Sequence, residues 1–375
     1  MTKLLVWTNM PNHYQRGLFD AMRAAGVDLR VAYYASVSAD RRAMGWSAEP
    51  DLPDGETFVD ANLGSLSMFS DWRERTHFVA GYGTAFLRSL ARRLARDRVP
   101  WVHWSERSHD GIRWAAGYPL KRAYAELVNR HALGAFGIGH RAMEDFHRWG
   151  IRREKLANLP YSPAGISREG ALDEACRVFK GEGKAFLFLG GLDHRKGIDL
   201  LLAAFARATT GAASRSTSTR WSLLLVGDDR SKGAYERQAR ELGIETSVLF
   251  RGPIPPGDLA TALRAAEVLV LPSRYDGWGV TLNEGASAGL ALIGSDACGA
   301  SEELVSPGEN GFVVEAGNVD SLARAMGAYV VDPELSGRHG QASRAIFAQN
   351  TPARAAERMV EALRSWEALA SSEQS

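Results

Sequence analysis

The sequence predicts an α/β protein made of two Rossmann-like, doubly wound domains. Short runs of continuously apolar residues alternate along the chain with segments of helical periodicity. Strands that are apolar throughout are typical of sheets covered on both faces, and their alternation with helices indicates parallel βαβ units. A length of 375 residues provides two domains, at about 100–200 residues for each.

The second half of the chain shows this alternation most clearly. The apolar runs 184–190 and 221–227 each end in glycine, and between them Ile198, Leu201, Leu202 and Phe205 recur at helical spacing. The same reading predicts the following further elements: helices over 233–242, 257–265 and 283–289, and strands over 247–250, 267–271, 290–294 and 311–314.

The first half repeats the pattern less regularly. It predicts strands over 3–7, 29–34, 100–104 and 134–138, and helices over 15–25, 82–97, 117–131 and 140–149, while 36–75 yields no clear assignment. Prolines and glycines are frequent over 160–183, which favours a domain junction there. We therefore expect one domain over 1–170, a second over 171–355, and a helix over 356–375 that returns to the first domain.

Composition excludes several classes of protein. With 45% hydrophobic and 24% charged residues, the chain is neither disordered nor collagen-like nor a coiled-coil rod. Cys176 and Cys298 form no disulfide framework or metal knuckle, which favours a reducing, cytoplasmic compartment. The net charge is +1 and no segment forms a dense basic face, so no nucleic-acid partner is expected.

Two predicted helices of the first half carry basic stripes. One stripe contains Arg88, Arg92, Arg93 and Arg96, and the other contains Lys121, Arg122 and Arg130. Peripheral contact with the anionic inner face of a membrane is one interpretation. A solvated helix face is the other. No apolar run reaches the ~18–20 residues of a membrane span, and the N-terminus lacks the pattern of a signal peptide.

The turn at 190–197 has the composition of an anion site. It reads Gly-Gly-Leu-Asp-His-Arg-Lys-Gly and lies between a predicted strand and a predicted helix. Glycines let backbone N–H groups approach a ligand, a helix start adds positive potential, and Arg195 and Lys196 add two cations. A diphosphate is the expected ligand, and an ordinary βα turn is the alternative. The turn matches neither a Walker P-loop nor G-x-G-x-x-G.

A second cluster occupies the loop between the predicted strand 267–271 and the predicted helix 283–289. It contains the carboxylates Asp276 and Glu284, separated by Gly277-Trp278-Gly279 and by the residues that lead into the helix. Carboxylates accept paired hydrogen bonds from vicinal hydroxyls of sugars and ribose. The backbone N–H groups of Leu282 and Asn283 are expected to point at an anion. A helix-capping surface loop is the alternative, although Trp278 suits such a loop poorly.

Asp276-x7-Glu284 resembles the E-x7-E motif of glycosyltransferase family 4 (glycosyl transferases group 1), retaining enzymes of the GT-B fold. Five further segments are similar to that family and occur in the same order, and the resemblance covers about 184–325. These segments are the turn 190–197, the strand 224–227, Phe250-Arg251-Gly252, Leu271-Pro272-Ser273, and Gly308 to Phe312. The segment Pro11 to Phe19 is similar to the opening of some members.

The resemblance implies two facing Rossmann-like domains, the second of which binds a nucleotide-diphosphate sugar. It implies that Lys196 and Arg195 hold the diphosphate, that Glu284 binds the ribose, and that Asp276 binds donor-sugar hydroxyls. The remaining donor contacts that it implies are Gly191, Gly227, Arg251 near the base, Gly277, Trp278, Gly279, Leu282 and Asn283. The first domain would then bind the hydroxyl acceptor.

Two residues depart from the family pattern. Asp276 stands where the family usually has the longer Glu, and Gly191 stands where it often has Arg, a place that Arg195 could fill. In the first domain, Glu106 and His109 follow a predicted strand and are candidates for sugar contacts, with a solvated loop as the alternative. His103 lies inside that strand and is expected to be core. His13 and Arg16 follow the first strand, and His140 begins a helix.

The implied reaction is transfer of a sugar with retention, assisted by Lys196, Arg195, Asp276 and Glu106. No cofactor is expected, and the absence of an Asp-x-Asp motif predicts transfer without a metal ion. The acceptor expected is a glycan or lipid-linked glycan of polysaccharide biosynthesis. Two alternatives stay open: another GT-B enzyme such as a nucleotide-sugar epimerase or a phosphorylase, and a catalytically silent sugar-nucleotide-binding protein.

Overall fold

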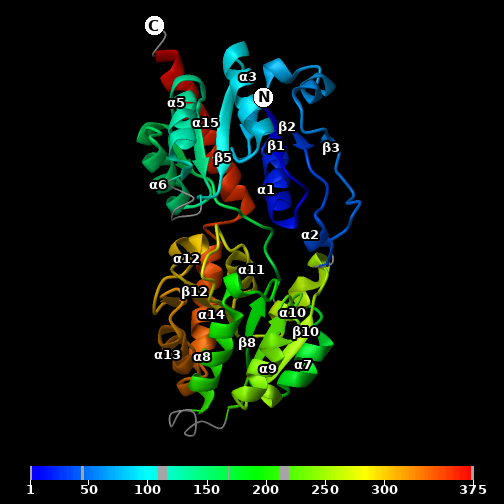
Figure 1. Cartoon of the computed structure of the whole chain (residues 1–375), viewed down its shortest axis with the longest axis vertical. Coiled ribbons are helices and arrows are strands. Elements are labelled where there is room, and N and C mark those ends of the chain that lie inside the picture. Colours follow the sequence, from blue (N-terminus) through cyan, green and yellow to red (C-terminus); the bar gives the residue numbers. More distant parts are fainter. Residues whose placement is uncertain (1, 44–45, 109–115, 168, 211–218, 373–375) are drawn as a thin grey trace. The chain divides into compact units, whose positions relative to one another are not determined.

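The computed structural model describes residues 2–43, 46–108, 116–167, 169–210 and 219–372. Within them the chain divides into two compact units. Unit 1 comprises 1–38, 47–164 and 351–375, and unit 2 comprises 39–46 and 165–350. Each unit has one sheet in which all neighbouring strands are parallel, with helices on both faces (Figure 1). The predicted architecture of two α/β domains is confirmed.

Unit 1 contains a seven-stranded sheet of order β3-β2-β1-β4-β5-β6-β7 among the described residues. Its strands are β1 (Lys3–Thr8), β2 (Asp28–Tyr33), β3 (Glu56–Phe58), β4 (Thr76–Val79), β5 (Trp101–Ser105), β6 (Gly134–Gly137) and β7 (Leu156–Asn158). Its principal helices are α1 (His13–Ala24), α3 (Ala85–Asp97), α5 (Tyr118–His131), α6 (His140–Trp149) and α15 (Pro352–Ser372). The short strands β3, β4 and β7 were not among the predicted ones.

Unit 2 contains a six-stranded sheet of order β10-β9-β8-β11-β12-β13 among the described residues. Its strands are β8 (Lys184–Leu189), β9 (Trp221–Val226), β10 (Val248–Gly252), β11 (Val268–Leu271), β12 (Ala291–Ser295) and β13 (Gly311–Val314). Its helices are α2 (Ala39–Ala43), α7 (Glu174–Lys180), α8 (Ile198–Thr210), α9 (Ala234–Glu241), α10 (Leu259–Arg264), α11 (Thr281–Ala288), α12 (Gly299–Leu304), α13 (Val319–Val331) and α14 (Leu335–Phe347).

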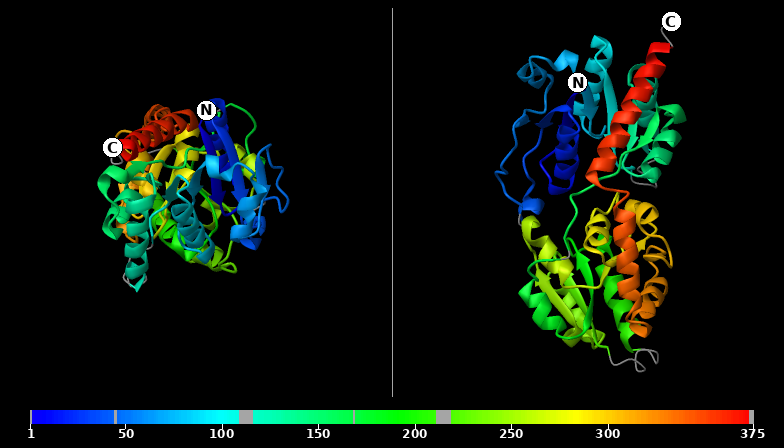
Figure 2. Two further views of the ribbon diagram at one scale, coloured as in Figure 1. Left: turned by 90° about the horizontal axis from the view of Figure 1, so that it is seen from above. Right: turned by 180° about the vertical axis from the view of Figure 1, so that it is seen from behind.

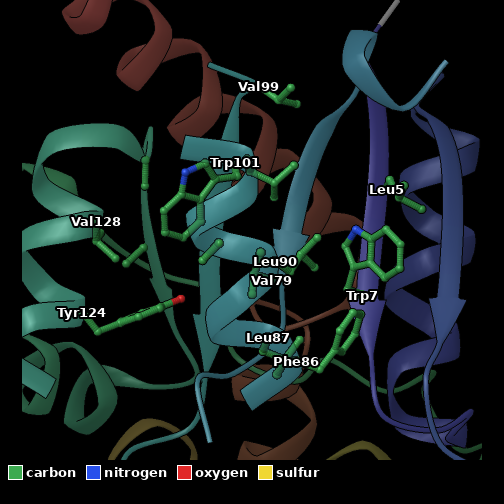
Figure 3. Packing of buried hydrophobic residues seen from close by; sticks show 14 of the residues in the cluster. Leu5, Trp7, Val79, Phe86, Leu87, Leu90, Val99, Trp101, Tyr124 and Val128 are labelled. Carbon is green, nitrogen blue, oxygen red and sulfur yellow. The ribbon is translucent and has the colours of Figure 1, made fainter. Parts of the chain in front are cut away.

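Buried aromatic and aliphatic side chains fill one face of the unit 1 sheet (Figure 3). Trp7 and Trp101 are fully buried there, beside Leu90 and Tyr124. His103 of β5 points into the same interior, with its ring centroid 5.0 Å from that of Phe146. Burial lowers the pKa of His103 to about 3 and that of His77 to about 4. Both imidazoles are therefore neutral in the folded unit.

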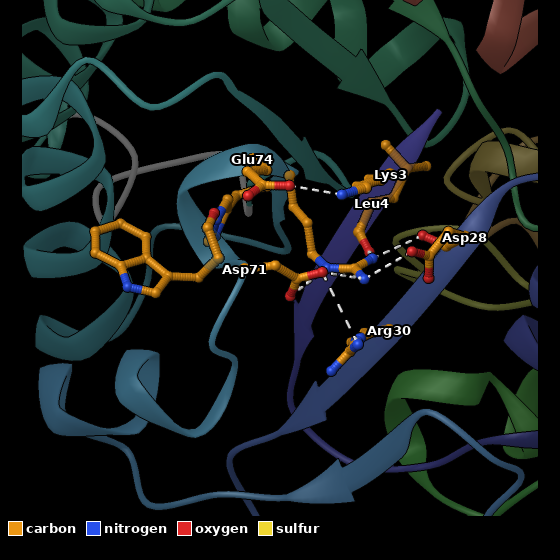
Figure 4. Close-up of polar contacts among 9 residues, drawn as sticks. Lys3, Leu4, Asp28, Arg30, Asp71 and Glu74 are labelled. Atoms are coloured by element: carbon orange, nitrogen blue, oxygen red, sulfur yellow. Dashed lines mark hydrogen bonds and ion pairs between the residues drawn. The ribbon is translucent and has the colours of Figure 1, made fainter. Parts of the chain in front are cut away.

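A buried arginine ties the amino ends of three strands together. Arg75 has no exposed side-chain surface and donates to both carboxyl oxygens of Asp71, at 3.0 and 2.7 Å. It also donates to the Asp28 carboxylate at 2.8 Å and to the Leu4 carbonyl at 3.3 Å (Figure 4). These contacts link β1 and β2 to the residue before β4, at the edge of the sheet opposite to its carboxyl ends. Arg75 therefore has a structural role.

The C-terminal helix α15 packs on unit 1, where α1 is one of its neighbours (Figure 2). Trp366 is 4% exposed. Its ring lies 4.7 Å from that of Phe136, and its Nε1 donates to the Glu154 carbonyl at 3.1 Å. A Cβ at Gly134 would collide with the Trp366 ring, so glycine leaves the space that the indole fills. No helix of the described residues is long and apolar enough to cross a bilayer.

Replacing Trp366 tests how α15 stabilises unit 1. Trp366→Ala should lower the free energy of unfolding by about 3–5 kcal/mol, because it removes a large buried side chain. Leu369→Ala is the matched control, since Leu369 is 48% exposed on the same helix, and it should change stability by less than about 0.5 kcal/mol. Denaturant unfolding measures both values. Equal effects of the two substitutions would contradict the docking of α15.

Acid should destabilise unit 1 through its neutral histidines. An unfolded histidine binds a proton below its ordinary pKa of 6.5, whereas His103 in the fold binds one only near pH 3. The contribution of His103 to the free energy of unfolding is therefore unaffected by pH above about 6.5, and it falls as the pH drops toward 3. At pH 5 His103 should account for a loss of about 2 kcal/mol.

The comparison of His103→Phe with wild type measures this loss. In His103→Phe the difference between the free energies of unfolding at pH 7 and pH 5 should shrink by about that amount. His131→Gln is the control, because His131 is exposed at the end of α5, and its pH dependence should match wild type. An unchanged pH dependence in His103→Phe would show that the imidazole titrates normally.

Candidate functional site

The strand order of the unit 2 sheet reverses between β8 and β11. β8 pairs with β9 on one side and with β11 on the other, so the chain moves outward from β8 in two directions. Ligands of open α/β sheets bind at the carboxyl ends of the strands, where such a reversal separates the loops. The turn 190–197 follows β8 and the loop 272–280 follows β11. The two clusters singled out in the sequence therefore flank the same reversal.

Backbone contacts hold the turn and the loop together. The Arg274 N–H donates to the Arg195 carbonyl at 2.8 Å, and Arg195 Nη1 donates to the Tyr275 carbonyl at 3.1 Å. Gly197 has a φ of +75° and lies so close to the Pro272 carbonyl that a Cβ would collide with it. Only glycine suits both requirements. The guanidinium of Arg195, an exposed residue, thus lies over the loop.

An ion pair between Lys196 and Asp276 forms the centre of this site. Lys196 Nζ lies 2.5 Å from Asp276 Oδ2, and the two side chains are 15% and 14% exposed. The Asp193 carboxylate accepts the Lys196 N–H at 2.8 Å, which fixes the backbone of the turn. A cation and a carboxylate are thus presented side by side. The cation suits a phosphate oxygen and the carboxylate suits a sugar hydroxyl.

A second ion pair braces the same two segments. Arg274 donates to both carboxyl oxygens of Asp199 at 2.7 Å each, and to the His194 carbonyl at 2.7 Å. Burial opposes ionisation of Asp199, but the hydrogen bonds from Arg274 outweigh it and hold the pKa of that carboxyl below its usual value. Sequence reasoning did not single out Arg274 or Asp199. The two residues are 75 positions apart, and no local signal in the sequence identifies them as partners.

The helix after the loop begins two residues earlier than the sequence indicated. α11 starts at Thr281, so Leu282 and Asn283 lie within its first turn. Their N–H groups donate to the carbonyls of Gly279 and Val280, at 3.0 and 2.9 Å. The prediction that these two N–H groups point at an anion is therefore wrong, because the tight turn into the helix already uses them. Glu284 lies in the same first turn and is 5% exposed.

Trp278 and its flanking glycines are part of the interior of unit 2. Trp278 is 2% exposed and donates from Nε1 to Asn283 Oδ1 at 2.8 Å. Cys298 donates from Sγ to the Trp278 carbonyl at 2.8 Å, and burial raises the pKa of this thiol to about 12. Gly277 and Gly279 are buried on either side. The indole therefore packs behind the loop, which explains why a tryptophan tolerates a glycine-rich turn.

The glycine turn also contacts the loop after β9. Gly227 has a φ of +153°, and a Cβ there would collide with the Gly190 carbonyl. The Leu192 N–H donates to the Asp228 carbonyl at 2.8 Å. Arg230 Nε lies 3.7 Å from the position that a Cβ on Gly191 would occupy, and 3.4 Å from Asp228 Oδ2. Arg230, which sequence reasoning missed, is thus a third cation beside the turn.

Arg251 has a structural partner in unit 2. Its Nε and Nη2 donate to the Asp173 carboxylate at 3.0 and 2.9 Å, and Asp173 also caps α7 by accepting the Cys176 N–H at 3.0 Å. The guanidinium expected near the nucleotide base therefore links β10 to α7.

The sheet of unit 1 has its own reversal of strand order, between β1 and β4. His13 begins α1 in the segment after β1, and Arg16 follows one turn later. Glu106 follows β5, the strand next to β4, and its carbonyl accepts the Ser105 hydroxyl at 3.1 Å. His140 begins α6, and its Nδ1 lies 3.4 Å from Asn158 Nδ2. His103 is core, as expected, and His109 lies outside the described residues.

Several basic side chains of the stripes on α3 and α5 have partners within the protein. Arg93 pairs with Asp97 at 2.6 Å, and Arg88 donates to the Tyr82 carbonyl at 2.8 Å. Lys121 is 3% exposed, with its Nζ 5.8 Å from the centroid of Trp149. These residues therefore do not act as free surface cations. Within the described parts of the chain, no cluster of three or more His, Cys, Asp or Glu residues could hold a metal ion.

Residues 174–368 match the family profile described as Glycosyl transferases group 1. Curated relatives include the lipopolysaccharide core biosynthesis mannosyltransferase LpcC of Rhizobium leguminosarum bv. viciae. It is 33% identical over 159 residues, which cover 40% of this chain and 42% of that protein. A D-inositol 3-phosphate glycosyltransferase of Streptomyces griseus is 32% identical over 166 residues, 42% of this chain and 34% of that protein. The chain thus matches about two fifths or less of these relatives' length.

Solved structures resemble the whole chain at low identity. Anabaena Alr3699/HepE in complex with UDP superposes with a TM-score of 0.74 at 18% identity, over 97% of this chain and 100% of that one. Sucrose-phosphate synthase from Thermosynechococcus elongatus gives a TM-score of 0.72 at 18% identity, over 98% and 100%. At this identity the similarity establishes the fold, which is the two-domain α/β GT-B fold.

Proposed function

Because the chain belongs to the glycosyl transferases group 1 family, we propose that it transfers a sugar from a nucleotide-diphosphate sugar to a hydroxyl group of an acceptor. The observation that carries this proposal is the contact between Lys196 and Asp276, 2.5 Å apart where the strand order of unit 2 reverses. A phosphate-binding cation and a sugar-binding carboxylate are adjacent there, as the linkage between diphosphate and sugar requires.

The donor is assigned to unit 2 residue by residue. Lys196 binds the diphosphate, and Arg195 and Arg230 add positive potential beside the glycine turn. The first N–H groups of a helix have no intrahelical partner, so we assign the phosphate contact of α11 to Thr281, in place of Leu282 and Asn283. Asp276 binds hydroxyls of the donor sugar.

Glu284 is the proposed ligand of the nucleotide ribose. It lies three residues after Thr281, in the first turn of α11, and is 5% exposed. A carboxylate so nearly buried is suited to accept two hydrogen bonds from vicinal hydroxyls that displace water. In this assignment Lys196 binds the diphosphate and Glu284 binds the ribose of the same nucleotide.

The proposed reaction retains the configuration of the sugar. The bond between the anomeric carbon and the diphosphate oxygen breaks, and a bond to the acceptor oxygen forms on the same face. The acceptor proton passes to the departing diphosphate, so no separate base is required. Negative charge grows on the diphosphate as it leaves, and fixed cations such as Lys196 stabilise that charge most in a site with little water.

The acceptor is assigned to the carboxyl edge of the unit 1 sheet. His13, Arg16 and Glu106 lie in the segments that follow β1 and β5 there. One relative is named a mannosyltransferase of lipopolysaccharide core biosynthesis, another a D-inositol 3-phosphate glycosyltransferase, and a third a glycogen synthase. We therefore propose a hydroxyl of a glycan or lipid-linked glycan as the acceptor, with Glu106 contacting one of the two sugars.

Donor binding is tested by titrating UDP-, GDP-, ADP- and TDP-glucose while thermal unfolding is followed. One of them should raise the unfolding temperature, and Lys196→Met should weaken its binding ~10–100-fold, as expected for a charged hydrogen bond. Lys180→Met is the control, since Lys180 pairs with Glu267 near the start of β11, and it should bind like wild type.

Three outcomes separate the candidate functions. Transfer or slow hydrolysis of the bound donor supports the proposal. Release of an altered sugar nucleotide without an acceptor would indicate an epimerase. Tight binding with neither transfer nor hydrolysis would indicate a silent sugar-nucleotide-binding protein, and binding unaffected by Lys196→Met would contradict the assignment of the diphosphate.

Transfer should proceed without a divalent metal ion. In this proposal Lys196 and its neighbouring cations neutralise the diphosphate, so the rate of sugar transfer should be unchanged, within about twofold, by excess EDTA. The measurement is the initial rate with EDTA and after addition of Mg²⁺ or Mn²⁺. A strict requirement for either ion would contradict this assignment.

A further inference from the structure

Arg274 differs from Arg195 and Arg230 beside the turn because its guanidinium forms a bidentate pair with a carboxylate of the protein. Its two terminal nitrogens are 2.7 Å from the two oxygens of Asp199, on the first turn of α8. The same Nη1 donates to the His194 carbonyl at 2.7 Å. A bidentate pair of this kind fixes direction as well as distance, which a single lysine contact does not.

Arg274 contacts residues on both sides of Lys196 in the sequence, but it does not contact Lys196 itself. Lys196 lies between His194, whose carbonyl Arg274 holds, and Asp199, whose carboxylate it holds. The backbone N–H of Arg274 donates to the carbonyl of Arg195 at 2.8 Å. Asp276, two positions after Arg274, accepts a hydrogen bond from the Lys196 ammonium. The arginine therefore joins the turn to the loop on both sides of the Lys196–Asp276 contact.

We propose that Arg274 is a positioning residue for the donor site: through Asp199 and the His194 carbonyl it sets the place of Lys196 relative to Asp276. This inference rests on the proposed function, because it assigns Lys196 and Asp276 to the diphosphate and the sugar. Arg274 itself contacts neither in this assignment. Its effect on the donor passes through the backbone of the turn 193–197.

The reason for a brace of this kind is the glycine content of the turn. Gly197 allows the close approach of the turn to the Pro272 carbonyl. Gly190, Gly191 and Gly197 together increase the conformational freedom of the turn. A flexible lysine on such a turn loses entropy when it binds a phosphate. The Arg274–Asp199 pair restricts the turn before the ligand arrives, so less order has to be created on binding.

The ligand-free test is hydrogen exchange in Arg274→Met, Arg274→Lys and Lys180→Met. Arg274→Met should speed amide exchange in peptides covering 193–199 and 272–276, and Arg274→Lys should restore part of the protection. Lys180→Met is the matched control. It removes an ion pair of similar burial, with side chains 17% and 21% exposed against 27% and 31% for Arg274 and Asp199, and should leave both peptides unchanged. Wild-type exchange in Arg274→Met would overturn the proposal.

The ligand test is a double-mutant cycle with UDP, GDP and ADP as probes, using the one that binds wild type most tightly. Lys196→Met should weaken binding on the order of tenfold or more in the wild-type background, but by less than about threefold in the Arg274→Met background, because the effects of residues coupled through one stretch of backbone are not additive. A merely structural role would weaken binding equally in both backgrounds, and this result would overturn the inference.

Failure of the proposed function has a different signature. If none of the three nucleotides binds the wild-type protein, the assignment of a nucleotide donor is wrong, whatever the variants do. The exchange measurement then still decides whether Arg274 orders the turn. Rescue by Arg274→Lys in both measurements, with thermal unfolding of all variants near that of wild type, would support the positioning role.

Discussion

The reversal of strand order between β8 and β11 is the constraint on which the site of unit 2 depends. Because every strand is parallel, all carboxyl ends meet at one edge, and the loops after β8 and β11 leave it in opposite directions. The space between such loops admits a ligand. The chain places Lys196 on one of these loops and Asp276 on the other, so residues 80 positions apart come into contact.

Contact among the loops after β8, β9 and β11 depends on glycines and on ion pairs within the protein. Gly197 and Gly227 let backbones approach where a Cβ would collide with a carbonyl oxygen. Such loops would be flexible by themselves, and the Arg274–Asp199 pair compensates by fixing one against the other. Trp278 and Cys298 support the loop from inside unit 2. The donor site that we propose is thus a set of short loops held by contacts from behind.

Much of the fold follows from local pattern, whereas the pairing of distant charges does not. The run 221–227 is apolar throughout and identified β9 directly, but Thr76 to Val79 is short and contains His77, so β4 escaped prediction. The clusters that hold Lys196 and Asp276 were recognisable from glycine and charge content. The partners of Arg251 and Arg274 lie 78 and 75 positions away, and no local signal identifies them. The first residue of α11 was missed because capping geometry, not periodicity, decides where a helix begins.

The most direct test of the central claim is a crystal structure of this protein with the nucleoside diphosphate that it binds most tightly. We expect the diphosphate to lie within hydrogen-bond distance of Lys196 Nζ and of the first turn of α11, and the ribose hydroxyls to bind Glu284. A nucleotide bound elsewhere on unit 2, with the Lys196–Asp276 pair untouched, would contradict it.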